Sequence, residues 1–317
     1  MKRVANLYEK IYSLENLLLA DVRAQKGKSD QYGVQQHNRH WAENILKLHD
    51  MLKQKCYHTS AYSTFKIYEP KEREIFRLPY FPDRITHHAV MNVLEPIFTG
   101  CFTADTYSCI KGKGIHGAQR ALERALKDRT GTQYCLKLDI RKFYPNINHG
   151  VLKSLLRRKF KDADLLWLLD EIIDSTDGLP IGNYLSQYFA NFYLTYFDHW
   201  MKEQQKVKYY FRYADDLVIL AADKPQLHRL LADIRLYLQV ELKLEIKGNY
   251  QVFPVQARGI DFIGYVFRHT HTRVRKTIKQ NCARKIKRSN NPQSKASYNG
   301  WFKHAYCINL KRKLQLA

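Results

Sequence analysis

The chain has 317 residues, of which 45% are hydrophobic, and its formal net charge at pH 7 is +23. This amount of apolar material excludes a wholly disordered chain, and the length predicts two or three subdomains rather than one core. So large a positive charge favours a polyanionic partner, with nucleic acid as the default, over a protein that is merely basic.

Neither the cysteines nor the first residues predict a secreted or membrane protein. The six cysteines lack a CxxC pair and zinc-type spacing, which favours free thiols in a reducing compartment. Residues 1–20 are charged and amphipathic, without an uninterrupted apolar stretch long enough for a signal peptide or a membrane span. We therefore expect a cytoplasmic protein with no membrane partner.

The apolar spacing of residues 1–70 predicts helices, interrupted by a polar loop over residues 24–36. Two apolar helix faces are expected, and their members are Ile11, Leu14, Leu17 and Leu18, then Trp41, Ile45, Leu46, Leu48, Met51 and Leu52. Residues 71–84 form an extended segment that is punctuated by proline and dense in lysine and arginine. A helix is expected over residues 85–98, and a glycine-rich loop leads into another that begins near Ile115.

Residues 134–147, YCLKLDIRKFYPNI, predict a strand that leads into a turn, and residues 151–174 predict two helices. LPIGNYLSQ, residues 179–187, reads as a loop before a helix whose buried stripe is Leu185, Phe189, Tyr193 and Phe197. Asp223 is expected to cap a later helix, and residues 243–247 and 260–267 read as strands. From Arg273 onward the chain has no Asp or Glu, and its apolar residues favour a small basic helical module over a disordered arm.

Two adjacent carboxylates, Asp215 and Asp216, separate the apolar runs 209–214 and 217–222, which read as the strands of a hairpin. Like charges repel and aspartate is a poor strand residue, so the pair indicates a bound cation more than an acidic turn. Asp139 ends the strand CLKLD and can complete a cluster that holds two Mg²⁺ ions for nucleotidyl transfer.

Tyr144 follows Asp139 by five residues, within KFYPNI. An aromatic ring at this place can lie under the sugar of an incoming nucleotide and clash with a 2′-OH. The simpler alternatives are that Asp139 caps a turn and that Tyr144 is an ordinary core residue.

In this order, LKLDIRKFYPNI, LPIGNYLSQYFANFYL, YFRYADDLVIL, the lysine of KLEIKGN and IDFIGYVF resemble the palm motifs of reverse transcriptases. KEREIFRLPYFPDRITHHAV and YSCIKGKGIHGAQRAL resemble fingers segments of bacterial and group II intron enzymes, so the resemblance covers nearly the whole chain. It implies an α+β, right-hand polymerase fold with an antiparallel palm sheet and helical fingers and thumb. The expected bounds are 1–133 and 151–178 for the fingers, 134–150 and 179–268 for the palm, and 269–317 for the thumb.

The resemblance also implies a role for each matching residue. Asp139, Asp215 and Asp216 would bind two Mg²⁺ ions, with the main-chain carbonyl of Ile140 as a further ligand. Lys247 would lie near the pyrophosphate as a proton donor.

Other matching residues would contact the primer or the incoming nucleotide. Gly264 would belong to the primer-grip hairpin, and Tyr144 would be the gate against ribonucleotides. The remaining nucleotide contacts would be Lys71, Arg73 and Arg77 at the triphosphate, and Ile181, Gly182 and Gln187 in the loop before the palm helix.

One departure narrows the family. Most reverse transcriptases have a Gln-Gly pair in this loop, whereas this chain has Ile181 and Gly182 and continues as IGNYLSQ. The IGxxxSQ pattern and the tail SYNGWFKHAYCINL resemble the enzymes of diversity-generating retroelements. A lost hydrogen bond to the nucleotide is worth about 1 kcal/mol, so we expect an error-prone polymerase. The alternatives are that Ile181 only fills apolar space and that Ser186 and Gln187 only buttress the loop.

This resemblance implies cDNA synthesis that is unfaithful opposite template adenine. The implied partners are a template-repeat RNA, the cDNA/RNA heteroduplex, dNTPs and a basic accessory protein that is pentameric in the family. The rivals are a group II intron or abortive-infection reverse transcriptase, a non-catalytic RNA-binding protein, and a primase or nuclease with the same metals. Ile181 argues against the group II intron enzyme, the intact acids against the non-catalytic protein, and Tyr144 with the motif order against the last.

Overall fold

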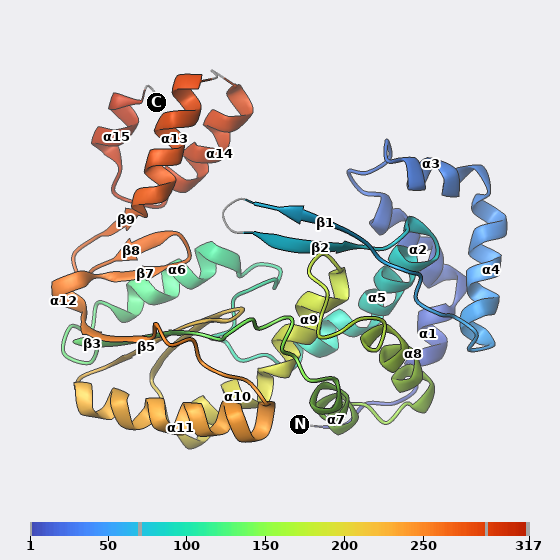
Figure 1. Cartoon of the computed structure of the whole chain (residues 1–317), viewed down its shortest axis with the longest axis horizontal. Helices are drawn as coiled ribbons and strands as arrows, with labels where there is room; N and C mark the ends of the chain where they lie inside the picture. The colour runs from blue at the N-terminus through green and yellow to red at the C-terminus, as the bar shows by residue number, and fades with distance from the viewer. Residues whose placement is uncertain (1, 69–71, 289–290, 315–317) are drawn as a thin grey trace. The chain divides into compact units, whose positions relative to one another are not determined.

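The computed structural model describes residues 2–68, 72–288 and 291–314, as helices and three antiparallel sheets (Figure 1). The chain folds into two compact units, each assembled from segments that are distant in sequence. The N-terminal unit comprises Met1–Phe102, Lys142–Tyr196 and Gln239–Leu244, and the sheet unit comprises Thr103–Arg141, Phe197–Leu238 and Glu245–Ala317.

The N-terminal unit is mainly helical. Its elements are α1 Tyr8–Tyr12, α2 Leu14–Gln25, α3 Tyr32–Arg39, α4 Trp41–Lys53, η1 Tyr80–Arg84, α5 Ile85–Cys101, α7 His149–Lys159, α8 Ala163–Ile173 and α9 Tyr184–Tyr193. Helix α5 packs against α2 and α9, and Phe98 in its last turn is fully buried among Phe160, Phe189 and Phe192. This aromatic cluster anchors the helix that follows the loop of residues 179–183.

The N-terminal unit also contains the hairpin of β1 Ser63–Ile67 and β2 Arg73–Arg77, in which Phe65 lies opposite Ile75. The expectation that residues 1–70 are helical is therefore wrong at β1, where STFKI contains β-branched and aromatic residues that favour strands. The expected loop over residues 24–36 is too long, because α3 begins at Tyr32 and buries Val34.

The two predicted apolar faces near the N-terminus are only partly buried. Ile11, Leu17, Ile45, Leu48 and Leu52 are buried, as expected. The structure leaves exposed four residues that were assigned to these faces, namely Leu14, Leu18, Trp41 and Leu46. Each face is thus narrower than the apolar spacing suggested.

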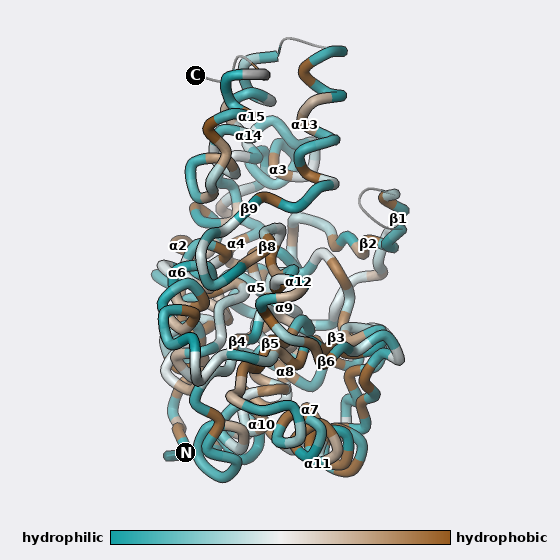
Figure 2. Tube along the Cα trace, turned by 90° about the vertical axis from the view of Figure 1, so that its left-hand side faces the viewer, coloured by the Kyte–Doolittle hydropathy of each residue, from teal (hydrophilic) through white to brown (hydrophobic). Residues whose placement is uncertain are grey.

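The sheet unit is built on a four-stranded antiparallel sheet in the order β4-β5-β3-β6. Its strands are β3 Tyr134–Asp139, β4 Tyr209–Tyr213, β5 Asp216–Ala221 and β6 Gln251–Pro254. Helix α6 Gly114–Ala125 covers one face and α11 Lys224–Leu242 the other (Figure 1). Figure 2 shows hydrophobic residues gathered along the central strands. Helices α10 Thr195–His199 and η2 Trp200–Gln204 precede β4.

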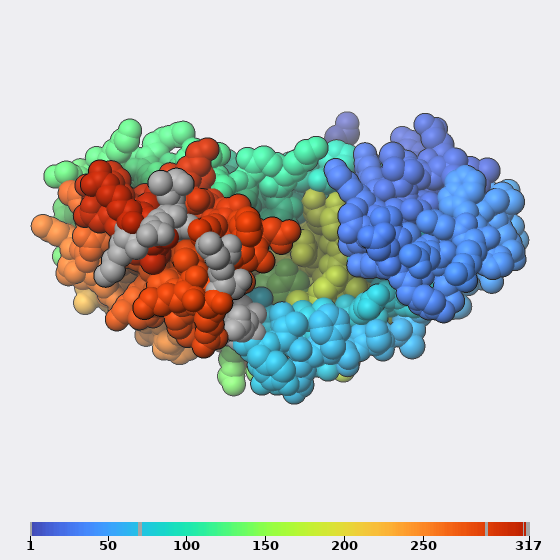
Figure 3. Space-filling model, turned by 90° about the horizontal axis from the view of Figure 1, so that it is seen from above, coloured from blue at the N-terminus to red at the C-terminus, as the bar shows by residue number. Residues whose placement is uncertain are grey.

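The C-terminal part of the sheet unit continues with a second sheet and three helices. These elements are α12 Val255–Arg258, β7 Ile260–Phe262, β8 Tyr265–Phe267, β9 Thr272–Val274, α13 Lys276–Arg288, α14 Pro292–Phe302 and α15 Ile308–Lys313. The predicted helical module is confirmed, and Figure 3 draws its helices in orange to red. The strand expected at residues 243–247 is wrong, because Lys243 has a φ of 53° and only Ile246 bridges to Ile140.

Two further expectations concern the thiols and the membrane. All six cysteines are free. Among the described residues, no helix has the length and hydrophobicity that crossing a membrane requires.

Candidate active site

The turn between β4 and β5 carries the two adjacent acids. Tyr213 pairs with Asp216 across the hairpin, so Ala214 and Asp215 form its tip. Ala214 adopts a φ of 54°, in the left-handed region that residues with a Cβ atom rarely enter. This tight turn brings both carboxylates to the start of β5.

The third acid reaches the same place from β3. Strand β3 is antiparallel to β5, and Asp139 lies opposite Asp216 in the register. The main-chain N–H of Ile140 donates to the carbonyl of Asp215 at 3.2 Å. The structure therefore brings together the three acids that the sequence singled out, with Ile140 beside them.

Two lysines contact these carboxylates. Lys247 donates its main-chain N–H to the carbonyl of Asp139 at 2.9 Å, and its ammonium group lies 2.5 Å from Oδ1 of the same residue. Lys137 on β3 lies 3.7 Å from Oδ1 of Asp216. Sequence reasoning identified Lys247 but missed Lys137, although its position two residues before Asp139 puts both on one face of the strand.

Burial and neighbouring negative charge raise the pKa of both Asp215 and Asp216. Burial raises the pKa of Asp216 to about 7, against the opposing charge of Lys137 and with added repulsion from Asp139 and Asp215. Burial, followed by the charge of Asp139, also raises the pKa of Asp215. Oδ1 of Asp216 is buried and accepts no hydrogen bond from the described residues. Carboxylates in this condition attract a cation.

The donor atoms of this cluster suit a hard divalent ion. Carboxylate and carbonyl oxygens are the ligands that Mg²⁺ prefers. No three His, Cys, Asp or Glu side chains in the described part of the chain already converge as a metal site. Lysines contact Asp139 and Asp216 instead. The fit to Mg²⁺ therefore rests on the oxygen donors of the three acids.

A fully buried ion pair supports the same hairpin, and sequence reasoning missed it. Arg212 on β4 and Asp198 on α10 are both 0% exposed, and Nε of Arg212 donates to Asp198 at 2.8 Å. Asp198 also accepts hydrogen bonds from Tyr210 and Thr106. Another guanidinium nitrogen of Arg212 donates to the carbonyl of Ala214 at 3.1 Å. The pair therefore fixes the turn that carries the acids.

Gly264 lies in the turn between β7 and β8, at a φ of 90°. A Cβ atom there would approach the ring of Trp301 to 2.5 Å, so the position requires glycine. Its carbonyl accepts a hydrogen bond from the main chain of Arg275 at 2.9 Å.

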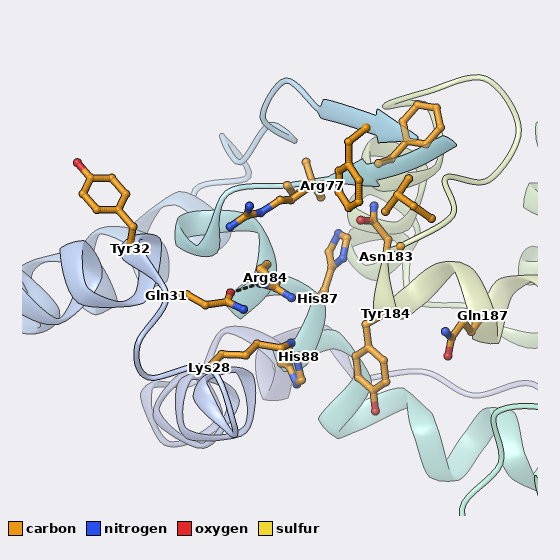
Figure 4. A pocket seen from close by; sticks show the side chains of 15 residues that line it. Lys28, Gln31, Tyr32, Arg77, Arg84, His87, His88, Asn183, Tyr184 and Gln187 are labelled. Atoms are coloured by element: carbon orange, nitrogen blue, oxygen red, sulfur yellow. Dashed lines mark hydrogen bonds between the residues drawn. The ribbon is translucent and has the colours of Figure 1, made fainter. Parts of the chain in front are cut away.

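A second set of predicted residues surrounds a cavity of about 710 Å³ within the N-terminal unit (Figure 4). Arg77, Gly182 and Gln187 line this cavity. Gly182 has a φ of 122°, and a Cβ atom there would lie 2.6 Å from the carbonyl oxygen of Phe76. Because the N–H of Phe76 donates to the carbonyl of Ile181 at 2.8 Å, the loop lies directly against β2.

Basic residues that the sequence analysis did not identify also line the cavity, namely Lys28, Arg84, His87 and His88. Burial and the charge of Arg84 lower the pKa of Lys28, and burial with the charge of Arg77 lowers that of Arg84. Burial, then Lys28, lowers the pKa of His88 to about 4. In Figure 4, Arg84 donates to Gln31 from the wall of this space. Cations held so close together favour an anionic ligand.

The remaining predicted nucleotide contacts are not among the residues that line this cavity. Tyr144 is half-buried in the turn after β3, with its ring 5.7 Å from that of Phe143. Arg73 is exposed at the start of β2, and the side chain of Ile181 is half-buried. Lys71 lies outside the described residues.

Comparisons with known proteins agree with the sequence motifs. Residues 70–267, more than half of the chain, match the reverse transcriptase (RNA-dependent DNA polymerase) family. Protein YkfC of Escherichia coli (strain K12) is 24% identical over 272 residues, which cover 69% of this chain and 71% of that protein. The group II intron-encoded protein LtrA of Lactococcus lactis subsp. cremoris is 24% identical over 180 residues, which cover 53% of this chain and 29% of LtrA.

Solved structures share the fold. Telomerase from Candida albicans, in complex with the TWJ fragment of telomeric RNA, aligns with a TM-score of 0.52 at 11% identity, over 73% of this chain and 51% of the telomerase. Apo telomerase from Candida tropicalis aligns with a TM-score of 0.50 at 12% identity, over 68% and 48%. The predicted α+β, right-hand polymerase fold, with an antiparallel palm sheet and helical fingers and thumb, is confirmed. The chain belongs to the reverse transcriptase family of RNA-dependent DNA polymerases.

Proposed function

We propose that this chain is an RNA-directed DNA polymerase that makes error-prone cDNA from the template-repeat RNA of a diversity-generating retroelement. The observation that carries the polymerase activity is the cluster of Asp139, Asp215 and Asp216 at the ends of adjacent strands. We assign residues 1–133 and 151–178 to the fingers, 134–150 and 179–268 to the palm, and 269–317 to the thumb.

The acids and the carbonyl of Ile140 would hold two Mg²⁺ ions. When bound, these ions supply activation of the attacking hydroxyl and neutralisation of the leaving pyrophosphate. Lys247 contacts Asp139 and would donate a proton to that pyrophosphate. Gly264 would position the primer through its hairpin.

The cations of the N-terminal unit would bind anionic substrate. Arg73, Arg77 and Lys71 would meet the triphosphate of the dNTP, as basic side chains do in phosphoryl transfer. The crowded cations around the cavity support an anionic ligand there. Tyr144 would exclude ribonucleotides, and Gln187 would contact the nucleotide from α9.

The IGNYLSQ loop supports mutagenesis that is directed to template adenine. The main chain of residue 181 is hydrogen-bonded to β2, which fixes the position of its Cα atom. Ile181 offers no hydrogen bond there, whereas a glutamine would. We expect Ile181→Gln to lower misincorporation opposite template adenine about five-fold, the equivalent of about 1 kcal/mol.

A second candidate is a group II intron or abortive-infection type reverse transcriptase without selective mutagenesis. The similarity to LtrA favours it. Both candidates would bind template RNA and the cDNA/RNA heteroduplex through the basic C-terminal helices. Only the diversity-generating enzyme would also bind a pentameric basic accessory protein.

Primer extension on an RNA template that contains all four bases tests both candidates. The reaction contains Mg²⁺ and dNTPs, and is run with and without the element's own RNA and accessory protein. The cDNA is then sequenced, beside that of a double variant with Asp215→Ala and Asp216→Ala.

Three outcomes separate the candidates. Activity that the double variant lacks, with errors concentrated at template adenines, supports the full proposal. Activity with rare, evenly spread errors retains the polymerase and rejects the diversity-generating type. Absence of extension under all conditions favours a non-catalytic RNA-binding protein.

A further inference from the structure

Lys137 is a half-buried lysine on β3 that none of the roles above uses. Residues alternate between the two faces of a strand, so Lys137 shares a face with Asp139. Its ammonium group lies 3.7 Å from Oδ1 of Asp216 and donates a hydrogen bond to the main-chain carbonyl of Asp261 on β7. This single side chain therefore contacts both the acidic cluster and the hairpin of β7 and β8.

The contacts continue from β7 to the turn of that hairpin. The carboxylate of Asp261 accepts a hydrogen bond from Nε of Arg275 at 2.6 Å. The main-chain N–H of Arg275 in turn donates to the carbonyl of Gly264 at 2.9 Å. A continuous path of polar contacts thus joins Asp216 to Gly264 through Lys137, and all of its members belong to the sheet unit.

We propose that Lys137 is a positioning residue that sets the spacing between the acidic cluster and the primer-grip hairpin and that competes with the metal for Asp216. This inference rests on the proposed polymerase function. An ammonium group beside a carboxylate repels a second cation that approaches it, while its hydrogen bond to Asp261 holds β7 in place. Lys137 therefore weakens metal binding at Asp216 and improves the placement of the primer.

A residue that only stabilised the fold would not have these two opposite effects. Removal of the Lys137 charge should make Asp216 easier to reach for a metal ion, and should leave β7 less well held. Damage to the fold would instead weaken both metal binding and primer extension. A variant that binds metal more tightly and extends primers more slowly is the signature of the proposed role.

The test uses the full chain with Lys137→Met, which removes the charge and keeps most of the unbranched side chain, and Lys137→Arg, which keeps the charge. The matched control is Lys224→Met, at an exposed lysine that begins α11. Mn²⁺ affinity is measured by electron paramagnetic resonance in the absence of nucleotide. Steady-state primer extension then gives kcat, the KM for primer–template and the Mg²⁺ concentration at half-maximal rate.

For Lys137→Met we expect Mn²⁺ to bind about two- to five-fold more tightly, the range for a partly exposed ion pair. The Mg²⁺ requirement should fall by a similar factor, and kcat should drop about ten-fold because the primer end is misplaced. Lys137→Arg should keep the wild-type Mn²⁺ affinity and recover most of kcat. Lys224→Met should behave as the wild type in every measurement.

Unchanged or weaker Mn²⁺ binding by Lys137→Met would overturn the competition with the metal. A wild-type kcat in that variant, or an equal loss in Lys224→Met, would overturn the positioning role. If the wild type extends no primer, the proposed polymerase function fails and the positioning role fails with it. The Mn²⁺ measurement still decides the competition in that case.

Discussion

Two groups of charged side chains meet at the β4–β5 hairpin, and they differ in how completely they are paired. Arg212 and Asp198 are 0% exposed, and hydrogen bonds surround both. The side chains of Asp139 and Asp216 are 32% and 27% exposed, and one oxygen of Asp216 accepts no hydrogen bond from the described residues. Buried charge is costly unless it is paired, and the first group is fully paired. The second group has three acids beside the two ammonium groups of Lys137 and Lys247, so it would accept a further cation. Incomplete pairing, rather than charge alone, distinguishes the candidate active site from the buried ion pair.

The largest expected effect is on activity, from a change in the acidic group. Asp215→Asn keeps the shape of the side chain but removes a charge that would hold metal. Because bound metal lowers the barrier by several kcal/mol, primer extension should fall about a thousand-fold or more. Single-turnover primer extension measures the loss, and urea unfolding of the same variant should show no loss of stability. A variant that retains a tenth of the wild-type rate would remove Asp215 from the reaction.

The second prediction concerns the stability of the fold and the buried ion pair of Arg212 and Asp198. Asp198→Ala leaves the guanidinium of Arg212 buried without its partner, which should lower the free energy of unfolding by about 3–5 kcal/mol. Equilibrium unfolding in urea measures this difference. The control is Glu203→Ala in η2, whose side chain is 68% exposed and which should change stability by less than about 0.5 kcal/mol. Equal stability of the two variants would contradict the support role of the pair.

Two glycines in the C-terminal part of the sheet unit differ in how closely other atoms surround them. Gly264→Ala introduces a Cβ atom at a φ of 90° against Trp301, and should cost about 1–3 kcal/mol of unfolding free energy. Gly300→Ala is the matched control, because Gly300 lies in α14 and a Cβ atom there meets nothing within 4 Å. That variant should be neutral or slightly stabilised, since alanine favours helices. Thermal unfolding of both proteins decides whether the Gly264 turn is as constrained as its geometry indicates.

The features that the sequence predicted are those determined by local pattern. The adjacent acids between apolar runs indicated the hairpin, and four-residue spacing identified the buried stripe that begins at Leu185. Asp223 caps α11 as expected, because its carboxylate accepts the N–H of Gln226 at 2.8 Å. In each case the residues that create the structure are neighbours in the chain.

The features that the sequence did not predict depend on contacts between distant residues. Asp198 reads as an ordinary helical acid, and only the folded chain brings it to Arg212. The cavity of the N-terminal unit brings Lys28, in the loop after α2, to Arg84 and His88 at the start of α5, and no spacing pattern relates Lys28 to the other two. Lys137 was visible in CLKLD, but its contact with Asp261 requires the β7 strand to lie alongside.

The smallest predicted effect concerns stability, and it tests whether the charge of Asp216 destabilises the fold when no metal is bound. In the metal-free protein, burial raises the pKa of Asp216 from 3.8 to about 7. The folded protein therefore binds this proton more tightly than the unfolded chain, and the resulting stability is present below about pH 4 and lost as the pH rises to about 7. Asp216→Asn cannot ionise, so above pH 7 it should unfold with about 1–2 kcal/mol more free energy than the wild type.

Urea unfolding in chelator between pH 4 and pH 8 measures this difference, which should vanish at the acidic end. Added Mg²⁺ should then stabilise the wild type more than Asp216→Asn, because only the wild type gains a ligand for its charge. Asp198→Ala should remain destabilised in Mg²⁺, because its unpaired charge lies in the support rather than in the acidic cluster. If Mg²⁺ stabilised Asp198→Ala and left the wild type unchanged, the metal would act at the buried ion pair rather than at the acids. The assignment of the acids to metal binding and of the ion pair to structural support would then be wrong.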